Sequence, residues 1–586
     1  MTVPDVTILK RFLTSAVIGA VPVLSWCFFA TLTIYAGNSD EFSVSFLQLL
    51  RVYLPYMLAM IVVFGLLGAM LRDDMLKKYW SVIAAFGVLI WLQGNIMVWD
   101  YGVLDGREIE WLADRWRGVL DLTIWAVVLL LAIVAYKRVG RVLIYSALAV
   151  LAIQTVNAVT ILGHDSGELL TRISIEPSRV GADALLRFSP RDNVVHIVMD
   201  GFQADIFEAI IDDPAYSHIR HDLKGFTLFR DNLGVFPYTQ MTVPALLSGK
   251  LYRNHVPADD FLSDTIKGET VFSVATDAGY EVDIAAPAEL KNMYSLAKHT
   301  NAYRITSNDH VSTADYVRKD SAKLLDLALF RVVPHFAKAM VYRDELWVFQ
   351  PRVSEEDYLH MQYFADLSFL RRLADGMSVD RESPVYKLIH VMLSHRPTVG
   401  NENCKYDGKH RTSRVAVTNQ ARCGLLHVLG VLKRMQELGI YDNSLIVLMA
   451  DHGAWVPVEN FTQDPDSGND VKPLTVAMAI PVLAIKPPGS QGAWQVSNAP
   501  TSVIDVPATI VDILGLNANF AGIPAYSLDP DAPRERRHLT YGYGINPKAK
   551  GYLFPMHEYK VVGNPYHASS WRMIQQHRPP ENSAGE

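Results

Sequence analysis

The stretch SLIVLMADHGAW, residues 444–455, places a carboxylate and an imidazole directly after an apolar run. The run has the length and composition of a buried strand. It ends at Asp451-His452-Gly453, so the strand would deliver both polar side chains at its carboxyl end. Such residues either begin an ordinary polar loop or belong to a metal site, and the ends of the neighbouring strands distinguish the two.

Four other stretches share the character of this strand. Short β-branched or aliphatic runs lie at residues 193–200, 279–286, 386–393 and 480–488, and helical patterns lie between them at 412–439 and 502–516. Apolar strands that alternate with helices are typical of a mostly parallel sheet covered by helices on both faces. We therefore predict an α/β domain, in which ligands bind at the carboxyl ends of the strands.

Three of the predicted strands carry candidate ligands at that edge. Asp200 ends the first strand, His395 follows the 386–393 strand, and Asp451-His452 follows the 443–450 strand. One polar strand end is uninformative, whereas three that share a sheet edge predict a site. We expect these side chains to lie close together.

A fourth element is GVFPYTQMTVPALLSGK, residues 234–250, which predicts a helix with Thr239 and Thr242 near its N-terminus. The free N–H groups and partial positive charge of a helix N-terminus favour a phosphate. Thr239 is either a helix N-cap or a nucleophile. Both roles can hold together, because a cap position directs its hydroxyl toward a bound anion.

These residue types fit metal-assisted phosphoryl chemistry. A divalent metal on the threonine oxygen lowers the pKa of the hydroxyl and polarises the phosphoryl oxygens. Carboxylates and imidazole suit zinc or manganese, with magnesium as a third candidate. The predicted site holds one metal ion on Asp200, Thr239, Asp451 and His452. His395 would bind the phosphate or protonate the leaving group.

Residues 1–162 form a predicted transmembrane domain of five helices. Five apolar stretches lie at about 12–36, 52–71, 80–99, 118–136 and 141–162. Each is near the ~20 residues that a helix needs to cross a bilayer core of ~30 Å. A buried soluble helix is the alternative for any one of them, but five in succession favour a membrane domain. The first is long for a signal peptide, and we interpret it as a retained helix.

The charges between these stretches predict the orientation. Basic residues precede the first stretch, separate the second from the third, and separate the fourth from the fifth: Lys10, Arg11, Arg72, Lys77, Lys78, Lys137, Arg138 and Arg141. The two other loops carry most of the acids: Asp40, Glu41, Asp100, Asp105, Glu108, Glu110 and Asp114. The positive-inside rule places the basic loops in the cytoplasm and everything after residue 162 outside it. We predict a multi-pass protein of the plasma (inner) membrane with a periplasmic or extracellular catalytic domain.

The remaining boundaries follow from changes in composition. Residues 163–192 are a polar connector that we interpret as interfacial, and residues 193–570 are the predicted catalytic domain, with a helical insertion at about 317–380. Residues 571–586 are a polar tail that we expect to be disordered.

The composition of the chain gives no sign of a nucleic-acid partner and leaves one cysteine pairing open. Hydrophobic residues make up 50% of the 586 residues, and the net charge of −7 gives no indication of nucleic-acid binding. Cys404 and Cys423 lie in the exported part, where disulfides are permitted. A bridge between them and two free buried thiols are both compatible with the sequence.

The order of these motifs resembles the alkaline phosphatase/sulfatase superfamily over roughly residues 193–530. The shared elements are a strand ending in Asp200, Thr239 ten residues before Gly249, His395, and Asp451-His452-Gly453. In that superfamily the nucleophile commonly stands ten residues before a glycine, which favours Thr239 over Thr242. True sulfatases need a cysteine or serine at this position, so the resemblance disfavours hydrolysis of sulfate esters.

The five-helix membrane domain narrows the resemblance to a lipid-using branch, namely the lipoteichoic acid synthases, phosphoglycerol transferases and phosphoethanolamine transferases. The segment HVMLSHRP, residues 390–397, is similar to the double-histidine motif of the phosphoethanolamine transferases. This similarity adds His390 as a candidate catalytic residue. Its alternative is a core histidine with satisfied hydrogen bonds.

The resemblance implies a mechanism in two steps. The threonine attacks the phosphate of a membrane phospholipid and diacylglycerol leaves. The phospho-threonine then passes phosphoglycerol or phosphoethanolamine to an envelope glycan or lipid. Two other functions stay open: a sulfatase-like phosphodiesterase or esterase that uses water as acceptor, and a catalytically silent lipid-binding regulator. The presence of Asp200, Thr239, Asp451 and His452 speaks against the silent regulator.

Overall fold

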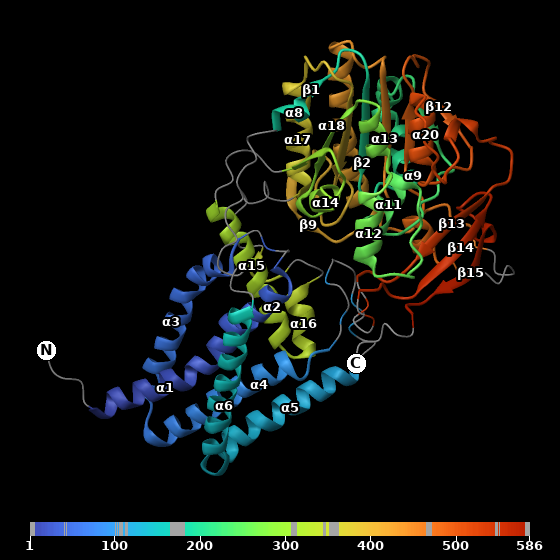
Figure 1. Cartoon of the computed structure of the whole chain (residues 1–586). Coiled ribbons are helices and arrows are strands. Elements are labelled where there is room, and N and C mark those ends of the chain that lie inside the picture. The colour runs from blue at the N-terminus through green and yellow to red at the C-terminus, as the bar shows by residue number, and fades with distance from the viewer. Residues whose placement is uncertain are drawn as a thin grey trace. The chain divides into compact units, whose positions relative to one another are not determined.

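The computed structural model of the chain forms two compact units (Figure 1). It describes residues 6–39, 44–99, 115–164, 182–305, 313–343, 347–350, 362–463, 471–544 and 551–580, with a few isolated residues between these ranges. Unit 1 comprises residues 1–176 and 310–358, and unit 2 comprises residues 177–309 and 359–586.

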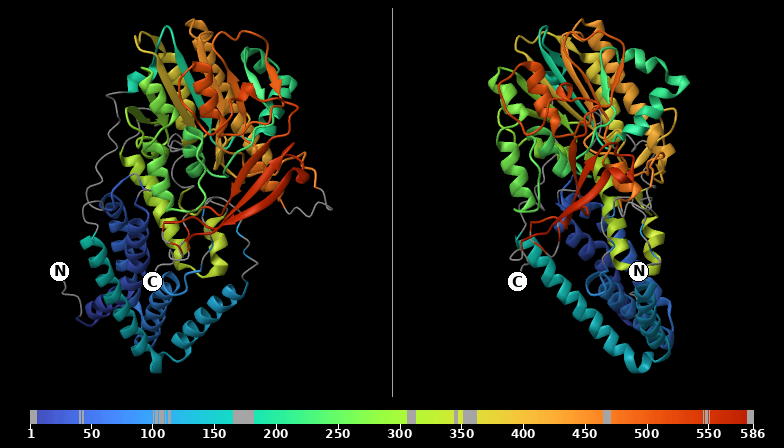
Figure 2. Two further views of the ribbon diagram at one scale, coloured as in Figure 1. Left: turned by 45° about the vertical axis from the view of Figure 1, so that its right-hand side comes forward. Right: turned by 90° about the vertical axis from the view of Figure 1, so that its right-hand side faces the viewer.

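The predicted five apolar helices are confirmed in unit 1. The first span is continuous through α1 (Val6–Leu24), the π-helix η1 (Ser25–Ala30) and α2 (Thr31–Gly37). The others are α3 (Phe46–Met70), α4 (Asp73–Asn95), α5 (Arg115–Val134) and α6 (Tyr136–His164). All five are long and apolar enough to cross a membrane. In the views of Figure 2, α5 and α6 diverge as the arms of a V from the short turn that joins them.

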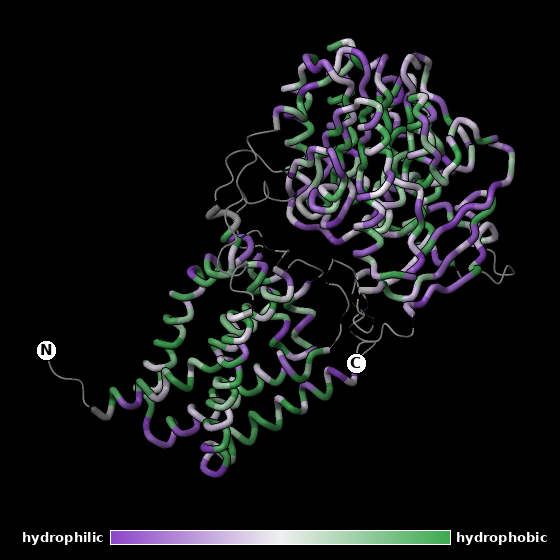
Figure 3. Tube along the Cα trace, viewed as in Figure 1, coloured by the Kyte–Doolittle hydropathy of each residue, from purple (hydrophilic) through white to green (hydrophobic). Residues whose placement is uncertain are grey.

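The outer faces of these helices are apolar. Large hydrophobic side chains such as Leu54, Val63 and Leu66 on α3 and Val127 and Leu130 on α5 are exposed. Figure 3 shows hydrophobic residues along most of the length of these helices. Exposed apolar surface on this scale is costly in water and matches the hydrocarbon of a bilayer. The acidic residues that we used to predict the orientation, in the loops near residues 40 and 100–114, lie outside the described part of the chain.

The helical insertion predicted at 317–380 is divided between the two units. Helices α15 (Thr313–Val332) and α16 (His335–Tyr342) belong to unit 1, whereas α17 (Gln362–Gly376) belongs to unit 2. A buried carboxylate ties α16 to the membrane helices, because Asp121 of α5 accepts hydrogen bonds from the His335 backbone N–H at 2.9 Å and from Gln93 Nε2 of α4 at 3.0 Å. Sequence pattern identified the helices but not this long-range association.

Unit 2 is built on an eight-stranded sheet with the order β12-β3-β11-β10-β2-β7-β4-β5. The five predicted strands are present as β2 (Asn193–Met199), β4 (Glu281–Ala286), β7 (Val385–Val391), β10 (Ser444–Met449) and β11 (Leu483–Lys486). The other three are β3 (Thr227–Phe229), β5 (Thr300–Arg304) and β12 (Gln495–Ser497). The sheet is mostly parallel, as predicted, and β11 is the strand that runs against its neighbours.

Side chains that alternate along the strands pack against helices on both faces of the sheet. One face carries Val194, Leu388 and Val447, and the helices α11 (Thr239–Ser248), α13 (Val271–Asp277) and α20 (Asp505–Leu514) contribute to the same core cluster. Helices α17 and α18 (Arg414–Glu437) lie on the other side of the sheet (Figure 1). Helix α18 is also long and apolar enough to cross a membrane, but it belongs to the α/β unit.

The prediction of a disordered tail from residue 571 onward is wrong for its first seven residues. Strand β15 (Trp571–His577) pairs with β14 (Met556–Val562), which pairs with β13 (Glu535–Thr540) in a three-stranded antiparallel sheet. Trp571 is fully buried, and its Nε1 donates to the carbonyl of Pro565 at 2.8 Å. The residues between Trp571 and His577 are exposed, which explains why this edge strand has a polar sequence. Residues 581–586 lie outside the described part.

Most of the predicted connector, residues 165–181, also lies outside the described part of the chain. Its last residues form α8 (Ala182–Leu186) and the short strand β1 (Arg187–Phe188).

Cys404 and Cys423 form a disulfide. Of the two alternatives compatible with the sequence, the structure therefore has the bridge and not the two free thiols.

The Cys404–Cys423 disulfide predicts a measurable loss of stability on its removal. The bridge joins residues 19 apart, and closing a loop of that size in the unfolded chain corresponds to about 3 kcal/mol. We expect Cys404→Ser/Cys423→Ser to lower the free energy of unfolding of the full chain by about this amount. Thermal and denaturant unfolding in detergent with and without reductant would measure it. An unchanged midpoint for both the variant and the reduced wild type would contradict this expectation.

Candidate metal centre

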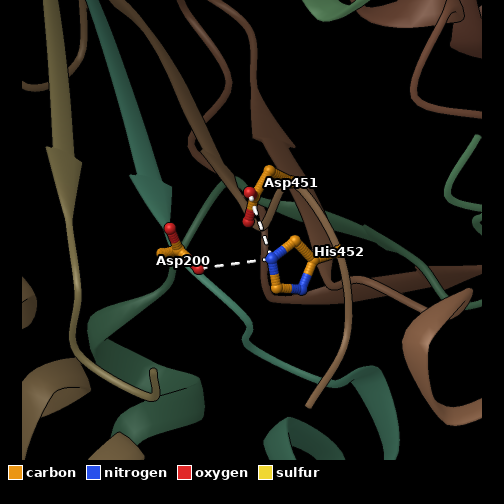
Figure 4. Close-up of side chains that lie close together, drawn as sticks. All are labelled: Asp200, Asp451 and His452. Carbon is orange, nitrogen blue, oxygen red and sulfur yellow. Dashed lines mark ion pairs between the residues drawn. The ribbon is translucent and has the colours of Figure 1, made fainter. Parts of the chain in front are cut away.

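Two neighbouring parallel strands bring the three central side chains together. Strand β2 ends at Met199 and Asp200 follows it, and β10 ends at Met449 with Asp451 and His452 two and three residues on. Val198 of β2 pairs with Met449 of β10, so the two carboxyl ends lie side by side. Figure 4 shows the carboxylates of Asp200 and Asp451 facing the same ring nitrogen of His452.

The polar atoms of this group face one another. His452 Nε2 lies 3.5 Å from Asp200 Oδ1 and 3.5 Å from Asp451 Oδ2. One ligand atom from each residue lies within 4.8 Å of the others, and all three residues are buried. In the described part of the chain, this is the one group of three acidic, histidine or cysteine residues with such spacing.

The chemistry of the group fits a bound cation. His452 Nδ1 lies 2.8 Å from the carbonyl oxygen of Gly453, so Nδ1 carries a proton and donates it. Nε2 then offers its lone pair toward the two carboxylates. Asp200 Oδ1 and Asp451 Oδ2 are buried, and neither accepts a hydrogen bond from any residue that the structure describes. Two orphaned anionic oxygens that face a nitrogen lone pair form a ligand set for a divalent metal.

The backbone around the group needs glycine at one position. Gly453 follows His452, and an added Cβ would lie 1.8 Å from the carbonyl oxygen of Ala477. Any side chain here would displace the backbone that carries Asp451 and His452. The Asp451-His452-Gly453 motif therefore contains its glycine for a steric reason.

Thr239 joins this group from a different element. It is the first residue of α11, and its Oγ1 donates to Asp200 Oδ2 at 3.1 Å. The same oxygen lies 3.4 Å from His452 Nε2. Thr242, the alternative nucleophile, is fully buried and donates instead to the carbonyl of Tyr238 at 2.9 Å. The structure thus directs the hydroxyl of Thr239, and not that of Thr242, toward the carboxylates.

His390 lies within β7 and contacts the centre from behind. Its Nε2 is 3.3 Å from Asp200 Oδ2, and its Nδ1 is 2.8 Å from the hydroxyl of Tyr294 at the end of α14 (Ala288–Tyr294). The ring is fully buried. His390 therefore has the satisfied hydrogen bonds of a core histidine and also holds an oxygen of Asp200.

His395 lies on the loop after β7, beside the centre. Its ring centroid is 6.4 Å from that of His452 and 4.9 Å from that of Trp455. Nδ1 donates to the carbonyl of Arg396 at 2.7 Å, so Nε2 is free to accept a proton. Burial lowers the pKa of His395, and the Asp200 carboxylate opposes that shift. The net effect favours a neutral ring.

The surrounding imidazoles keep one carboxylate ionised. Burial by itself would raise the pKa of Asp200, but His395, His390 and His452 together hold it below its usual range. A buried carboxylate that stays ionised is the form that binds a cation.

The sequence analysis did not single out three residues of this region, namely Trp455, Tyr294 and Asp366. Trp455 packs edge-on against both His395 and His452, and the Arg396 guanidinium lies 4.2 Å above its ring. Tyr294 holds His390, as described above. Asp366 of α17 is fully buried, and its Oδ2 accepts a hydrogen bond from the Met392 N–H, between His390 and His395. Trp455 lies only three residues after His452, and that proximity was the one signal available for it.

Three histidines near the end of the chain lie away from this centre. His538 is buried in β13, where its Nδ1 lies 2.8 Å from the carbonyl oxygen of Gly234. His557 contacts Gln576 across β14 and β15, and His567 follows β14. None of them belongs to the Asp200, Asp451 and His452 group in the described residues.

The sequence comparison defines the class of this chain. A family model described as Sulfatase matches residues 192–516, which is more than half of the chain and contains every residue of the centre. The chain therefore belongs to the sulfatase family within the sulfatase/alkaline phosphatase superfamily. None of the curated protein sequences compared with it matches significantly.

Solved structures with a similar course of the chain include a lipoteichoic acid synthase, a periplasmic domain solved with zinc and a phosphonate monoester hydrolase. The lipoteichoic acid synthase LtaP from Listeria monocytogenes is 8% identical, with 66% of this chain and 88% of that chain covered and a TM-score of 0.39. The zinc complex of the periplasmic domain of EcEptC from Escherichia coli is 12% identical, with 62% and 92% covered and a TM-score of 0.35. The phosphonate monoester hydrolase SpPMH from Silicibacter pomeroyi is 15% identical, with 66% and 88% covered and a TM-score of 0.37. At these identities the likeness is one of fold only.

Removal of one carboxylate should empty the centre of metal. Asp451→Ala deletes a ligand, and we expect its metal affinity to fall by more than the roughly 10–100-fold that loss of an outer-shell partner costs. Elemental analysis of the purified full chain would measure the metal content. Asp512→Ala, at an exposed aspartate on α20, is the matched control and should keep the wild-type content. Full metal occupancy in Asp451→Ala would contradict the assignment of Asp451 as a ligand.

Asp366 predicts a characteristic dependence of stability on pH. Burial raises its pKa from an ordinary value near 4 to about 8, so the folded chain takes up a proton in this window. The free energy of unfolding of the wild type should therefore fall, relative to that of Asp366→Asn, as the pH rises from about 4 to about 8. Thermal unfolding of both proteins across this range would measure the difference. Asp375→Asn, at an exposed position of the same helix, is the control, and a constant difference between Asp366→Asn and wild type would exclude this titration.

Proposed function

We propose that this chain transfers a phospho-head group from a membrane phospholipid to an acceptor hydroxyl of the cell envelope through a phosphorylated Thr239. The observation that carries the proposal is the position of the Thr239 hydroxyl, 3.1 Å from Asp200 Oδ2 and 3.4 Å from His452 Nε2. The head group in the proposal is phosphoglycerol or phosphoethanolamine.

The local structure of α11 supports Thr239 as the nucleophile. The helix starts at Thr239, and no side chain caps its first turn. Its first N–H groups and the helix dipole therefore favour the phosphate that Thr239 would attack. The hydroxyl is also half-buried rather than enclosed, so a substrate can reach it.

The metal ligands in the proposal are Asp200, Asp451, His452 and the Thr239 oxygen. When bound, zinc or manganese, or alternatively magnesium, would lower the pKa of the threonine hydroxyl and neutralise charge on the phosphoryl oxygens. Asp200 Oδ2 accepts the hydrogen bond of the Thr239 hydroxyl and so orients that hydroxyl toward the centre. His390 orients that carboxylate, and its other ring nitrogen shares a hydrogen bond with the Tyr294 hydroxyl.

The proposed reaction has two displacements at phosphorus. In the first, the Thr239 Oγ–P bond forms and the bond from phosphorus to the diacylglycerol oxygen breaks, and that oxygen takes a proton as diacylglycerol leaves. In the second, an acceptor oxygen bonds to phosphorus, the Thr239 Oγ–P bond breaks, and the acceptor hydroxyl gives up its proton. The proton that Thr239 loses is the one that the diacylglycerol oxygen takes up. His395, with Nε2 free, is placed to accept the proton of the acceptor hydroxyl, which then returns to the Thr239 oxygen.

A membrane phospholipid as donor is supported by unit 1. The same chain carries five helices that are long and apolar enough to cross a membrane. We propose that they lie in the plasma (inner) membrane and that the α/β unit is periplasmic or extracellular, where the Cys404–Cys423 disulfide is stable.

Thr239→Ala tests this proposal. The variant should lose diacylglycerol release from labelled phospholipid by at least about 10³-fold, because the nucleophile is absent, while its metal content stays near that of wild type. Thr242→Val is the matched control, since it deletes a buried hydroxyl that bonds within its own helix, and it should keep activity within a few-fold. Near-normal turnover in Thr239→Ala would transfer the role to Thr242 or to a metal-bound water.

The acceptor dependence of the same assay separates the two enzymatic functions. Diacylglycerol release that requires added envelope glycan or lipid supports transfer, and release without any acceptor supports hydrolysis. A wild-type chain that binds metal and releases no product from any phospholipid would exclude a phospholipid donor. The alternatives would then be a sulfatase-like esterase that acts on another substrate and the silent regulator.

A further inference from the structure

Unit 2 contains a second hollow that the metal centre does not use. It is a cavity of about 780 Å³, which lies within the 300–1,000 Å³ typical of small-molecule sites. We call it the side pocket and define it by six of its lining residues: Asp205, Glu208, Arg230, Asn460, Asn498 and Tyr566.

The side pocket lies at the same edge of the sheet as the metal centre. Arg230 follows β3 directly and Asn498 follows β12 directly. Both strands run in the direction of β2 and β10, because β12 is parallel to β3 and two successive antiparallel pairings link β3 to β10 through β11. Strand β3 is three positions from β2 in the sheet, which corresponds to about 14 Å at the usual spacing between strands.

The segments that carry the metal ligands also build the pocket. Helix α9 (Ala204–Asp212) starts four residues after Asp200 and contributes Asp205 and Glu208. The chain that leaves His452 reaches the pocket at Asn460 and then pairs with the opposite wall, where the Thr462 N–H donates to the Tyr566 carbonyl at 3.0 Å. The pocket and the centre are therefore directly connected through the backbone on two sides.

Most of the charged groups that line the pocket are paired, including Arg534 with Asp505, and the exposed Asp531 adds a further carboxylate. Arg414 NH1 lies 2.9 Å from Asp205 Oδ2, Arg230 pairs with Glu208, and Arg536 NH2 lies 3.4 Å from Asp231 Oδ1. Because each of these three arginines is already paired with a carboxylate, none of them is free to bind a phosphate or sulfate. The exposed carboxylate of Asp531 would also repel such an anion.

What the pocket offers instead is neutral hydrogen-bonding capacity. Asn460 and Asn498 are exposed, and neither side-chain amide bonds to any other residue in the described part of the chain. Tyr566 adds an aromatic ring with a polar tip. The apolar lining consists of small groups, such as Pro500 and Pro533, and holds no large aliphatic side chain that would suit an acyl chain. Free amides beside an aromatic ring match a ligand that presents both hydroxyl groups and flat C–H faces.

We propose that the side pocket binds the sugar rings of an uncharged glycan acceptor, whose hydroxyl then reaches the phosphorylated residue at the neighbouring metal centre. This inference rests on the transfer function proposed above and narrows its acceptor to a neutral carbohydrate. Asn460 and Asn498 would donate to and accept from ring hydroxyls, and Tyr566 would stack against a ring face.

Saturation-transfer NMR on the full chain tests the pocket. The protein is placed in phospholipid nanodiscs, which avoids detergents with sugar head groups, and the probes are maltose, cellobiose, gentiobiose and lactose, with inorganic phosphate as the anionic comparator. We expect at least one disaccharide to bind with a dissociation constant in the millimolar range or lower. Asn460→Ala/Asn498→Ala should weaken that binding by about five-fold or more, since two hydrogen-bonding groups are lost.

Controls separate this proposal from the transfer function. Asn517→Ala/Asn519→Ala removes two exposed asparagines outside the pocket and should leave disaccharide binding unchanged, and Thr239→Ala should also keep it. Absence of binding by all four disaccharides to the wild type, equal binding by the pocket variant, or competition by inorganic phosphate would overturn the sugar pocket. If disaccharides bind as expected but the wild type never releases diacylglycerol, the transfer function fails and the pocket assignment stands.

Discussion

The constraint on which the α/β unit depends is the close confinement of two carboxylates that are almost completely buried. Asp200 and Asp451 are 1% and 0% exposed, and their facing oxygens are grouped within 4.8 Å around the unprotonated nitrogen of His452. Like charges at such separations repel strongly at low dielectric constant, and a lone pair between them adds to the repulsion. A divalent cation removes this conflict, which makes the group intelligible as a metal centre rather than as the start of an ordinary loop.

The neighbouring structure holds these groups in place through short contacts from several elements. The Gly201 N–H donates to Asp451 Oδ1 at 3.2 Å, and the Ser394 hydroxyl donates to the carbonyl of Asp200 at 2.7 Å. His390 and Tyr294 fix the second oxygen of Asp200. Ligands that are oriented by such outer contacts lose little freedom when they bind an ion, and Thr239 meets them at the start of a helix whose dipole favours phosphate. Two strand ends, one helix N-terminus and the surrounding hydrogen bonds therefore all position groups of the same site.

Unit 1 is stabilised differently, by buried polar groups within a bundle of apolar helices. Its helices expose apolar side chains and yet enclose polar groups, of which Asp121 is the clearest example. This fully buried aspartate of α5 accepts hydrogen bonds from Gln93 of α4, from the indole of Trp99 and from the first N–H of α16. A carboxylate inside an apolar helix bundle is tolerated only when it is satisfied in this way. The association of α16 with the membrane helices thus depends on specific hydrogen bonds to Asp121. The segment that carries α15 and α16, residues 310–358, interrupts the sequence of the α/β unit.

The local patterns of the sequence were sufficient for two conclusions. Runs of about twenty apolar residues specified five candidate membrane helices, and buried strands ending in Asp200 and Asp451-His452 specified a parallel sheet with ligands at one edge, because burial periodicity and strand direction are encoded locally. Other features depended on contacts between distant segments. The reversal of β11, the return of residues 310–358 to unit 1 and the pairing of β15 with β14 have no local signature. The same holds for Tyr294, Asp366 and the side pocket, since each arises where segments up to several hundred residues apart are packed together. Sequence alone therefore predicted which residues form the candidate metal site and favoured Thr239 through a resemblance. The tertiary structure decided that the Thr239 hydroxyl faces these residues and which side chains surround them.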